Sequence, residues 1–370
     1  MDVSGLVNVR EFETAARARL DPVHYDYFAG GAQDEITVRA NEAAFGRLSL
    51  VPRVLRGAGA PRLDVTVLGS PMAMPVIMAP TAFHRLAHPE AERATARAAG
   101  GAGVTMIAAM LATVTIEDIA AEYRKAAGDI GSDLWFQLYV QRDLRFTEAM
   151  VRRAEDAGCR ALIVTTDSPA LGRNERNDRN HFLDLPPGIR CENMREPSPD
   201  GPPDEAAEDR APVGARPVDL SPEISWRHID WLRGITALPI VLKGVLHPYD
   251  ARLAVESGID GLIVSNHGGR QLDTTPATID QLPLIADVTE GRVPLLVDGG
   301  IRRGTDVIKA LALGADAVAV GRPVIWGLAA AGEEGVARVL ALLRAELTNA
   351  LTLCGCDSPR SVGRHLVRKV

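Results

Sequence analysis

Cysteines are few in this chain of 370 residues, and no long apolar run interrupts it. The four cysteines, Cys159, Cys191, Cys354 and Cys356, form no CxxC pair of the kind that binds zinc, and the N-terminal residues lack an apolar signal core. A membrane-spanning helix needs about 18 or more consecutive apolar residues, and none of the runs reaches that length. We therefore expect a cytoplasmic protein with no membrane segment, no structural disulfide and no metal site.

An excess of positive charge is also missing. The formal net charge is −7 and the sequence pI is about 5.7, so the basic surface that is typical of a nucleic-acid-binding protein is not expected. Hydrophobic residues make up 46% of the chain, which is ample for a large core. The length suits one large α/β barrel or two ordinary domains.

Strand-like and helix-like segments alternate from Pro75 onward. A helix over Val9–Leu20 and an aromatic segment, HYDYF, come before them, and Gly57–Gly69 is predicted to be irregular or a hairpin lid. The predicted strands are Val76–Ala79, Val104–Ala108, Trp135–Val140, Ala161–Thr166, Ile240–Lys243, Leu262–Ser265, Pro294–Val297 and Ala317–Val320. The predicted helices between and after them are Glu90–Ala99, Ile116–Ala126, Arg145–Ala157, Ser225–Ile235, Tyr249–Glu256, Thr278–Val288, Thr305–Leu313 and Glu334–Leu351. Eight such units predict an α/β fold, a single (β/α)8 TIM barrel over residues 1–370 with an N-terminal helical segment.

One connection breaks this rhythm. The segment Ser168–Leu220, after the fourth strand, is rich in Pro, Gly, Asp and Glu. Such a composition buries little apolar surface, so we predict a mobile active-site lid or a disordered loop there.

Polar residues gather where the predicted strands end. The stretch GLIVSNHGGRQLD (261–273) is a strand followed by a turn that carries His267 and Arg270. An imidazole can accept a proton near neutral pH, and a guanidinium can bind a carboxylate through two hydrogen bonds. The alternative is that His267 only caps a strand end and Arg270 is a solvated surface charge.

The other strand ends strengthen the first interpretation, because the catalytic residues of a TIM barrel lie at the C-terminal ends of its strands. Glycine-rich turns after the last two strands carry Arg302 and Arg322, which together predict a phosphate site. Lys243 ends the fifth strand and could form a Schiff base, balance an anion or pair inside the core. Its neighbours favour the counter-charge to an anion.

Several motifs in the same order resemble the FMN-dependent 2-hydroxy-acid oxidase and dehydrogenase family. They are APTA, QLYV, LKGV, SNHGGRQLD, DGGIRRGTDVIKALALGA and GRP, and the resemblance runs from HYDYF to the CGC near the C-terminus. It implies bound FMN, a small 2-hydroxy acid and O2 as reactants, and a homo-oligomer, by resemblance a tetramer.

The resemblance also implies residue roles. His267 would be the base, Asp167 the partner of its protonated form, Arg270 and Tyr27 the carboxylate clamp, and Tyr139 a substrate hydrogen-bonder. Lys243 would stabilise the negative charge of the reduced flavin ring. The implied FMN-binding residues also include Pro80, Thr81, Ala82, Gln137, Tyr139, Thr165 and Ser265 around the ring, with Ala82 bordering the substrate, and Asp298, Gly299, Gly300, Arg302, Gly321 and Arg322 around the ribityl chain and phosphate.

The chain departs from the family pattern at three places. Asn174 stands where the family usually has an arginine, which leaves open whether Arg173 or Arg176 supplies that cation. Ala109 and Leu111 replace a serine and, compared with glycolate oxidase, a tryptophan. With Ala108 and Phe83 they favour a wide pocket for an aromatic substrate such as mandelate or 4-hydroxymandelate. The alternative is that the loop 168–220 fills this space and leaves a short-chain glycolate or lactate oxidase.

Three rival functions share parts of this pattern. A dehydrogenase that uses another electron acceptor would keep the same site, but the lack of a membrane segment in the loop and Ala82 favour an oxidase that forms H2O2. An aldolase would use Lys243 covalently and leave the flavin motifs unexplained. An FMN-binding protein without turnover would not need His267 and Arg270. Transfer of a hydride and removal of the α-proton both use His267, and the sequence does not separate them.

Overall fold

A closed barrel of eight parallel strands forms the centre of the molecule. A computed structural model describes residues 2–57, 59–128, 131–194 and 219–370. In chain order the barrel strands are β4 (Val76–Met78), β5 (Met106–Ala109), β6 (Leu134–Leu138), β7 (Leu162–Thr165), β8 (Ile240–Val245), β9 (Gly261–Val264), β10 (Leu295–Asp298) and β11 (Ala317–Val320). Each pairs with the next, and β11 closes on β4. The predicted TIM barrel is confirmed.

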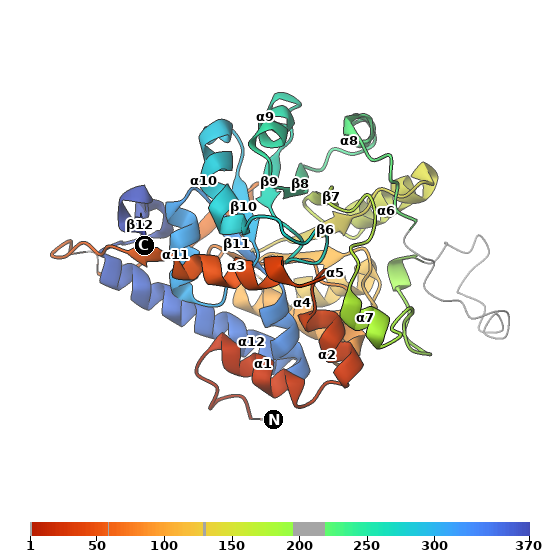
Figure 1. Ribbon diagram of the computed structural model, residues 1–370, viewed down its shortest axis with the longest axis horizontal. Helices are drawn as coiled ribbons and strands as arrows, with labels where there is room; N and C mark the ends of the chain where they lie inside the picture. The colour runs from red at the N-terminus through yellow and green to blue at the C-terminus, as the bar shows by residue number, and fades with distance from the viewer. Residues whose placement is uncertain (1, 58, 129–130, 195–218) are drawn as a thin grey trace.

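A ring of helices covers the barrel (Figure 1). They are α4 (Ala91–Ala102), α5 (Ile116–Ala127), α6 (Leu144–Asp156), α8 (Trp226–Ile235), α9 (Pro248–Glu256), α10 (Thr278–Thr289), α11 (Gly304–Ala312) and α12 (Arg322–Cys354). The last helix differs from the prediction because it begins directly after β11, at Arg322. Its backbone leaves helical geometry at Ala331 and Gly332, so the periodic pattern restarts only near the predicted start, Glu334.

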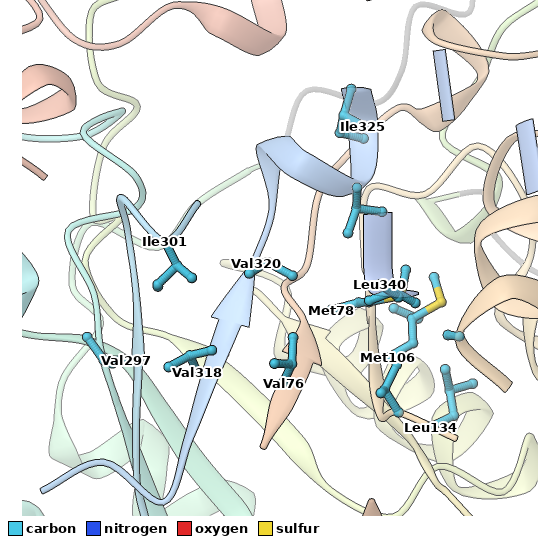
Figure 2. Close-up of a cluster of buried hydrophobic side chains, with 14 of the residues drawn as sticks. Val76, Met78, Met106, Leu134, Val297, Ile301, Val318, Val320, Ile325 and Leu340 are labelled. Atoms are coloured by element: carbon cyan, nitrogen blue, oxygen red, sulfur yellow. The ribbon is translucent and has the colours of Figure 1, made fainter. Parts of the chain in front are cut away.

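Two apolar layers hold barrel and helices together. Side chains that alternate along the strands, such as Ile77, Ile107 and Ile263, fill the barrel interior. The intervening side chains face the helices and are fully buried. Figure 2 shows part of this outer layer, with Val76 on β4 and Val318 on β11 near residues of α12. Because both faces of every strand are covered, the strands are continuous apolar runs rather than alternating ones.

In the described residues before the barrel there are three helices, where one was predicted. They are α1 (Val9–Arg17), α2 (Pro22–Ala29) and α3 (Ile36–Gly46). The HYDYF segment is part of α2, which starts at the Asp21 cap. Helix α1 lies along α12 (Figure 1). Close to the C-terminus, β12 (Val367–Lys369) pairs with β1 (Leu48–Leu50), so the C-terminal segment is attached to the segment that follows α3.

The predicted hairpin exists, but it is not a lid over the polar strand ends. Strands β2 (Val65–Val67) and β3 (Ser70–Met72) form an antiparallel pair. Val67 and Met72 pack into the barrel interior, and the Trp135 indole donates to Ser70 Oγ at 3.1 Å. Since Trp135 lies near the start of β6, the hairpin closes the opposite end of the barrel.

The first part of the long loop after β7 contains helical turns. It contains α7 (Glu175–Arg179), which packs beside α2 (Figure 1), and a short 3-10 turn at Glu192–Met194. The remainder of the predicted lid, up to residue 218, lies outside the described residues. The described part of the chain contains no helix with the length and apolar character needed to cross a bilayer. All four cysteines are buried thiols.

Candidate active site

One cavity of about 740 Å³ opens at the C-terminal ends of the barrel strands. Its size lies in the range of small-molecule and cofactor sites. Fifteen of the predicted site residues line it: Tyr27, Pro80, Thr81, Ala82, Gln137, Tyr139, Lys243, His267, Arg270, Asp298, Gly299, Gly300, Arg302, Gly321 and Arg322. The other three, Thr165, Asp167 and Ser265, lie behind the wall, and each is hydrogen-bonded to a lining residue.

His267 and Asp167 form a pair at the cavity wall. His267 lies in the turn after β9, and its Nδ1 is 3.0 Å from Asp167 Oδ1. A carboxylate only accepts hydrogen bonds, so Nδ1 carries a proton, and in the neutral form of the ring Nε2 has a free lone pair. Nε2 lies 3.5 Å from the Tyr139 hydroxyl. The pair therefore presents a basic nitrogen next to a hydroxyl at the cavity.

Asp167 is held in its ionised form. Burial alone would raise its pKa, but the His267 ring and the Lys243 ammonium outweigh burial and lower the pKa below its usual value. The backbone makes room for this carboxylate at Gly244, where an added Cβ would lie 2.6 Å from Asp167 Cγ. Gly244 interrupts the regular register of β8, so a local irregularity in the strand positions the partner of the histidine.

The two tyrosines of the site remain protonated. Burial raises the pKa of Tyr139, and the nearby Asp167 carboxylate raises it further. Burial also raises the pKa of Tyr27, and the Arg270 cation partly opposes that shift. Both hydroxyl groups are therefore available as hydrogen-bond donors.

The Arg270 side chain is anchored by backbone carbonyls of the N-terminal segment. Its Nη1 donates to the Tyr27 carbonyl at 2.6 Å and to the Gly30 carbonyl at 3.0 Å. Its guanidinium also lies 4.9 Å from the centre of the Tyr27 ring. These contacts fix one edge of the guanidinium and leave its other N–H groups for an anion.

Lys243, Ser265 and Asp298 form a buried cluster on three neighbouring strand ends. Lys243 Nζ donates to Ser265 Oγ at 3.0 Å and lies 3.3 Å from Asp298 Oδ2. Ser265 Oγ donates to the same oxygen at 2.9 Å. Asp298 Oδ1 is buried and has no partner among the described residues. The cluster therefore offers a cation and an unsatisfied acceptor to whatever fills the cavity.

Gln137 is fixed by its contacts on both sides. Its Nε2 donates to Thr165 Oγ1 at 3.0 Å, and its Oε1 accepts from Met110 N at 3.2 Å. The amide orientation is therefore determined, and the remaining N–H of Gln137 can face the cavity.

The glycine-rich ends of β10 and β11 carry two arginines, of which Arg302 is buried and Arg322 is half-buried. Arg302 pairs with Glu42 of α3 at 2.9 Å. Arg322 donates to the carbonyls of Phe28, Gly30 and Gly268 at 2.8 to 3.0 Å. Burial and the neighbouring cations lower the pKa of Arg322 to about 9. A cation under such repulsion is stabilised strongly in its charged form by a nearby anion.

The loop after β7 supplies residues that the sequence did not single out. They are Leu171, Asn177, Phe182, Leu183, Asp184, Leu185 and Cys191, all of which line the cavity. Two neighbouring rings, Phe83 and Phe182, each lie 5.4 Å from the Tyr27 ring. An irregular, polar segment gives no periodic signal that would mark such residues in advance.

Neither arginine beside Asn174 takes the place of the family's arginine. Arg176 pairs with Asp26 and Glu35 at 3.1 and 2.6 Å, and Arg173 pairs with Asp178 at 3.0 Å on the surface. Asn174 itself lines the cavity and caps α7. Position 174 therefore contributes an amide to the cavity wall where the family usually has a cation.

The chain resembles known proteins along its whole length. Residues 16–369 match the sequence model of the family described as FMN-dependent dehydrogenase. The chain belongs to the FMN-dependent dehydrogenase family. It is 43% identical to an L-lactate oxidase of Nostoc sp., with 97% of each chain covered. It is 44% identical to the human 2-hydroxyacid oxidase 1, with 98% of this chain and 97% of the relative covered.

Solved structures agree with the fold. Mandelate oxidase in complex with (S)-2-phenylpropionate is 41% identical, has a TM-score of 0.86 and aligns over 98% of both chains. The same values hold for mandelate oxidase with benzoyl-formic acid. The family, the fold and the FMN-dependent oxidation of a 2-hydroxy acid that the sequence predicted are therefore confirmed at the level of the family.

The residues of the cavity fit FMN. Among the described residues, four cations (Lys243, Arg270, Arg302 and Arg322) and two carboxylates (Asp184 and Asp298) line it, and this excess of positive charge suits a phosphate and a carboxylate. The unpartnered Asp298 Oδ1 can accept from a hydroxyl group. At Gly300, with φ of 84°, an added Cβ would overlap the Asn41 carbonyl. Position 300, which lines the cavity, must therefore have no side chain.

Proposed function

We propose that the chain is an oxidase of aromatic (S)-2-hydroxy acids, such as mandelate or 4-hydroxymandelate, which produces the 2-keto acid and reduces O2 to H2O2. The observation that carries this proposal is the aromatic and apolar side of the cavity. Tyr27, Phe83 and Phe182 form a ring cluster there. Ala109 and Leu111 border the same cavity with small or aliphatic side chains.

His267 is the proposed base. Its Nε2 accepts a proton from the bound hydroxy acid, and Asp167 stabilises the imidazolium through the 3.0 Å bond to Nδ1. The Tyr139 hydroxyl, 3.5 Å from Nε2, donates a hydrogen bond to the substrate. Arg270, with the Tyr27 hydroxyl, binds the substrate carboxylate. Ala82 borders the substrate without filling its space.

FMN, when bound, accepts the electron pair that the substrate loses. Lys243 balances the negative charge that the reduced cofactor carries. The proposed ring-binding residues are Pro80, Thr81, Ala82, Gln137, Tyr139, Thr165 and Ser265, of which Thr165 and Ser265 act through Gln137 and Lys243. The proposed residues for the ribityl chain and phosphate are Asp298, Gly299, Gly300, Arg302, Gly321 and Arg322.

The size of the expected preference follows from apolar burial. Fully burying a phenyl-sized side chain contributes about 1.5–3 kcal/mol. That corresponds to about 10- to 150-fold in kcat/KM, because about 1.4 kcal/mol is a factor of ten. Glycolate has no side chain to bury, so it should gain nothing from the ring cluster.

One observation favours a short-chain oxidase as the second candidate. Phe182, Leu183 and Leu185 come from the loop after β7 and line the same cavity. If these side chains fill the aromatic side when substrate is bound, only glycolate or lactate would fit.

A substrate panel with peroxide detection in air separates the two candidates. We expect kcat/KM for mandelate to exceed that for glycolate and lactate by at least about tenfold, the lower end of the burial range. Leu111→Trp should reduce mandelate turnover more than glycolate turnover, because the indole would occupy the aryl space. Leu353→Trp, at an exposed site on α12, is the matched control. Higher kcat/KM for glycolate or lactate than for mandelate in the wild type would favour the second candidate.

The electron acceptor is tested separately. Rapid reoxidation of the substrate-bleached flavin in air, with one peroxide formed per reduction, would support an oxidase. Slow reoxidation that a quinone or carrier protein accelerates would support a dehydrogenase. Assembly into a homo-oligomer, by family resemblance a tetramer, and location in the cytoplasm remain part of the proposal; sedimentation and cell fractionation test them.

A further inference from the structure

A buried chain of hydrogen bonds connects the cavity wall to helix α4. Thr81 lines the cavity, and its Oγ1 lies 2.6 Å from His84 Nε2. On the other side of the ring, His84 Nδ1 lies 3.0 Å from Thr95 Oγ1. The Thr95 hydroxyl donates in turn to the Ala91 carbonyl at 3.4 Å. His84 and Thr95 are 2% and 0% exposed, so water does not compete for these bonds.

The hydrogen bond to the Ala91 carbonyl determines which group donates in each of the other hydrogen bonds. A carbonyl only accepts, so the Thr95 hydrogen points at Ala91 and Thr95 Oγ1 accepts from His84 Nδ1–H. A neutral imidazole carries one hydrogen, which leaves His84 Nε2 as an acceptor. The Thr81 hydroxyl must therefore donate to Nε2. Its oxygen offers only lone pairs to the cavity.

The surroundings keep the His84 ring neutral. Burial lowers the pKa of His84, although the nearby Glu92 carboxylate and a backbone contact with Thr81 oppose the shift. The Glu92 oxygens accept from His84 N at 3.1 Å, from Thr113 N at 2.9 Å and from Thr113 Oγ1 at 2.7 Å. Glu92 is thus engaged with backbone groups and Thr113, and both ring nitrogens are left to the two threonines.

We propose that His84 is a positioning residue that fixes the Thr81 hydroxyl as a hydrogen-bond acceptor toward bound FMN and so stabilises the reduced cofactor. The inference rests on the proposed contact of Thr81 with the flavin ring. Two-electron reduction of an isoalloxazine adds an N–H donor to a ring whose oxidised form has an acceptor nitrogen in that place. An acceptor-only oxygen in the wall therefore favours the reduced form. Neither His84 nor Thr95 touches the cavity, so the effect passes through Thr81 alone.

Three variants test the direction of the hydrogen bonds between Thr81, His84 and Thr95. His84→Leu removes the acceptor nitrogen, so the Thr81 hydroxyl is free to donate toward the cavity. His84→Gln replaces the ring by an amide that can accept from Thr81 and donate to Thr95. Thr113→Val is the matched control, because it removes a hydroxyl from the same buried network without touching the His84 ring.

The measurement is the ratio of reduced to oxidised FMN in the holoenzyme at equilibrium with a reference dye, without oxygen or substrate. His84→Leu should lower this ratio about fivefold, the size of one net hydrogen bond, or about 20 mV for a two-electron couple. His84→Gln and Thr113→Val should keep the wild-type ratio. An unchanged ratio in His84→Leu, or an equal fall in His84→Gln, would overturn the proposal.

A second measurement needs no variant. The ¹⁵N chemical shifts of His84 in the wild-type holoenzyme should show hydrogen on Nδ1 and none on Nε2, and hydrogen on Nε2 would overturn the proposal even if His84→Leu fails to fold. Because neither measurement uses a substrate, a short-chain preference in the substrate panel would overturn the proposed function only.

Discussion

At the scale of single residues, His267 combines an unusual backbone with an ordinary hydrogen-bonding pattern. Its φ is 59°, in the left-handed region that non-glycine residues seldom adopt. Its backbone N–H donates to Ser265 Oγ at 3.1 Å while its Nδ1 contacts Asp167. These two bonds aim Nε2 at the cavity. Strain of this kind is common where a catalytic side chain must point in one direction.

Replacing His267 by alanine should separate cofactor binding from chemistry. We expect His267→Ala to retain FMN and to slow bleaching of the flavin by hydroxy acid by about 10²–10⁴, the usual contribution of a general base. Rapid-mixing absorbance measures the rate, and His365→Ala, at an exposed site near the C-terminus, is the control. Bleaching at wild-type speed would show that another group accepts the proton.

The lowered pKa of Asp167 predicts how acid affects stability. The folded-state pKa lies below the usual value of 3.8, so the pairing with His267 and Lys243 contributes its full stabilisation above that value. This contribution is lost as the pH falls through the lowered pKa. Between about pH 5 and about pH 3, the melting temperature of the wild type should fall more steeply than that of Asp167→Asn. Parallel curves would contradict the assignment.

At the scale of elements, helix α3 holds the turns that follow β9 and β10. Asp273 accepts from Ile36 N and Thr37 N at 3.2 and 2.8 Å, so a distant carboxylate caps the helix. Asn41 exchanges two amide hydrogen bonds with Asn266, the residue before His267, at 2.8 and 2.9 Å. The position of the histidine turn therefore depends on an element outside the barrel.

The contact between α3 and the turn after β10 should be intolerant of a single methyl group. Gly300→Ala would place its Cβ against the Asn41 backbone, so we expect weaker FMN retention and a lower melting temperature. Gly291→Ala is the matched control, because Gly291 also has a positive φ, 68°, but has open space around it. The free energy of unfolding of the control should fall by only about 1–2 kcal/mol because of backbone strain, and the control should keep its FMN. Equal losses in both variants would mean that strain, and not the contact, matters.

The barrel elements could be predicted from sequence because each strand is an apolar run buried on both sides. The predicted Ala317–Val320 coincides with β11, and the other strand boundaries shift by at most two residues. Helix α3 could not be predicted, since Ile36, Thr37 and Val38 are β-branched and favour strands locally. Its cap comes from Asp273, far along the chain. The polar strand ends were predictable because the topology brings them together, whereas Phe182 belongs to a loop without a periodic pattern.

At the scale of the whole molecule, the cavity brings together several cations that repel one another. Burial lowers the pKa of Arg322, and the nearby Arg270 and Arg302 cations lower it further. An anion bound there relieves the repulsion and adds its own binding energy to the stability of the fold.

Removal of FMN should therefore destabilise the entire protein. With free FMN at about 100 times its Kd, binding stabilises the folded state by about 2.7 kcal/mol. We expect the apoprotein to melt several degrees lower than the holoprotein, and the difference to grow with added FMN in differential scanning calorimetry. Riboflavin, which lacks the phosphate, should restore less of this difference. Full restoration by riboflavin would show that the arginines do not bind the phosphate.

The cavity wall combines Tyr27 and Phe28, which come early in the sequence, with Arg322, which follows the last barrel strand. A ribosome releases these residues in that order, so α2 and α3 emerge long before the turns they must contact. The helices have no docking partner until β9, β10 and β11 have followed them out of the exit tunnel. Cofactor capture must accordingly wait until Arg322 has been translated, and a truncated nascent chain that ends before Arg322 should leave FMN in solution.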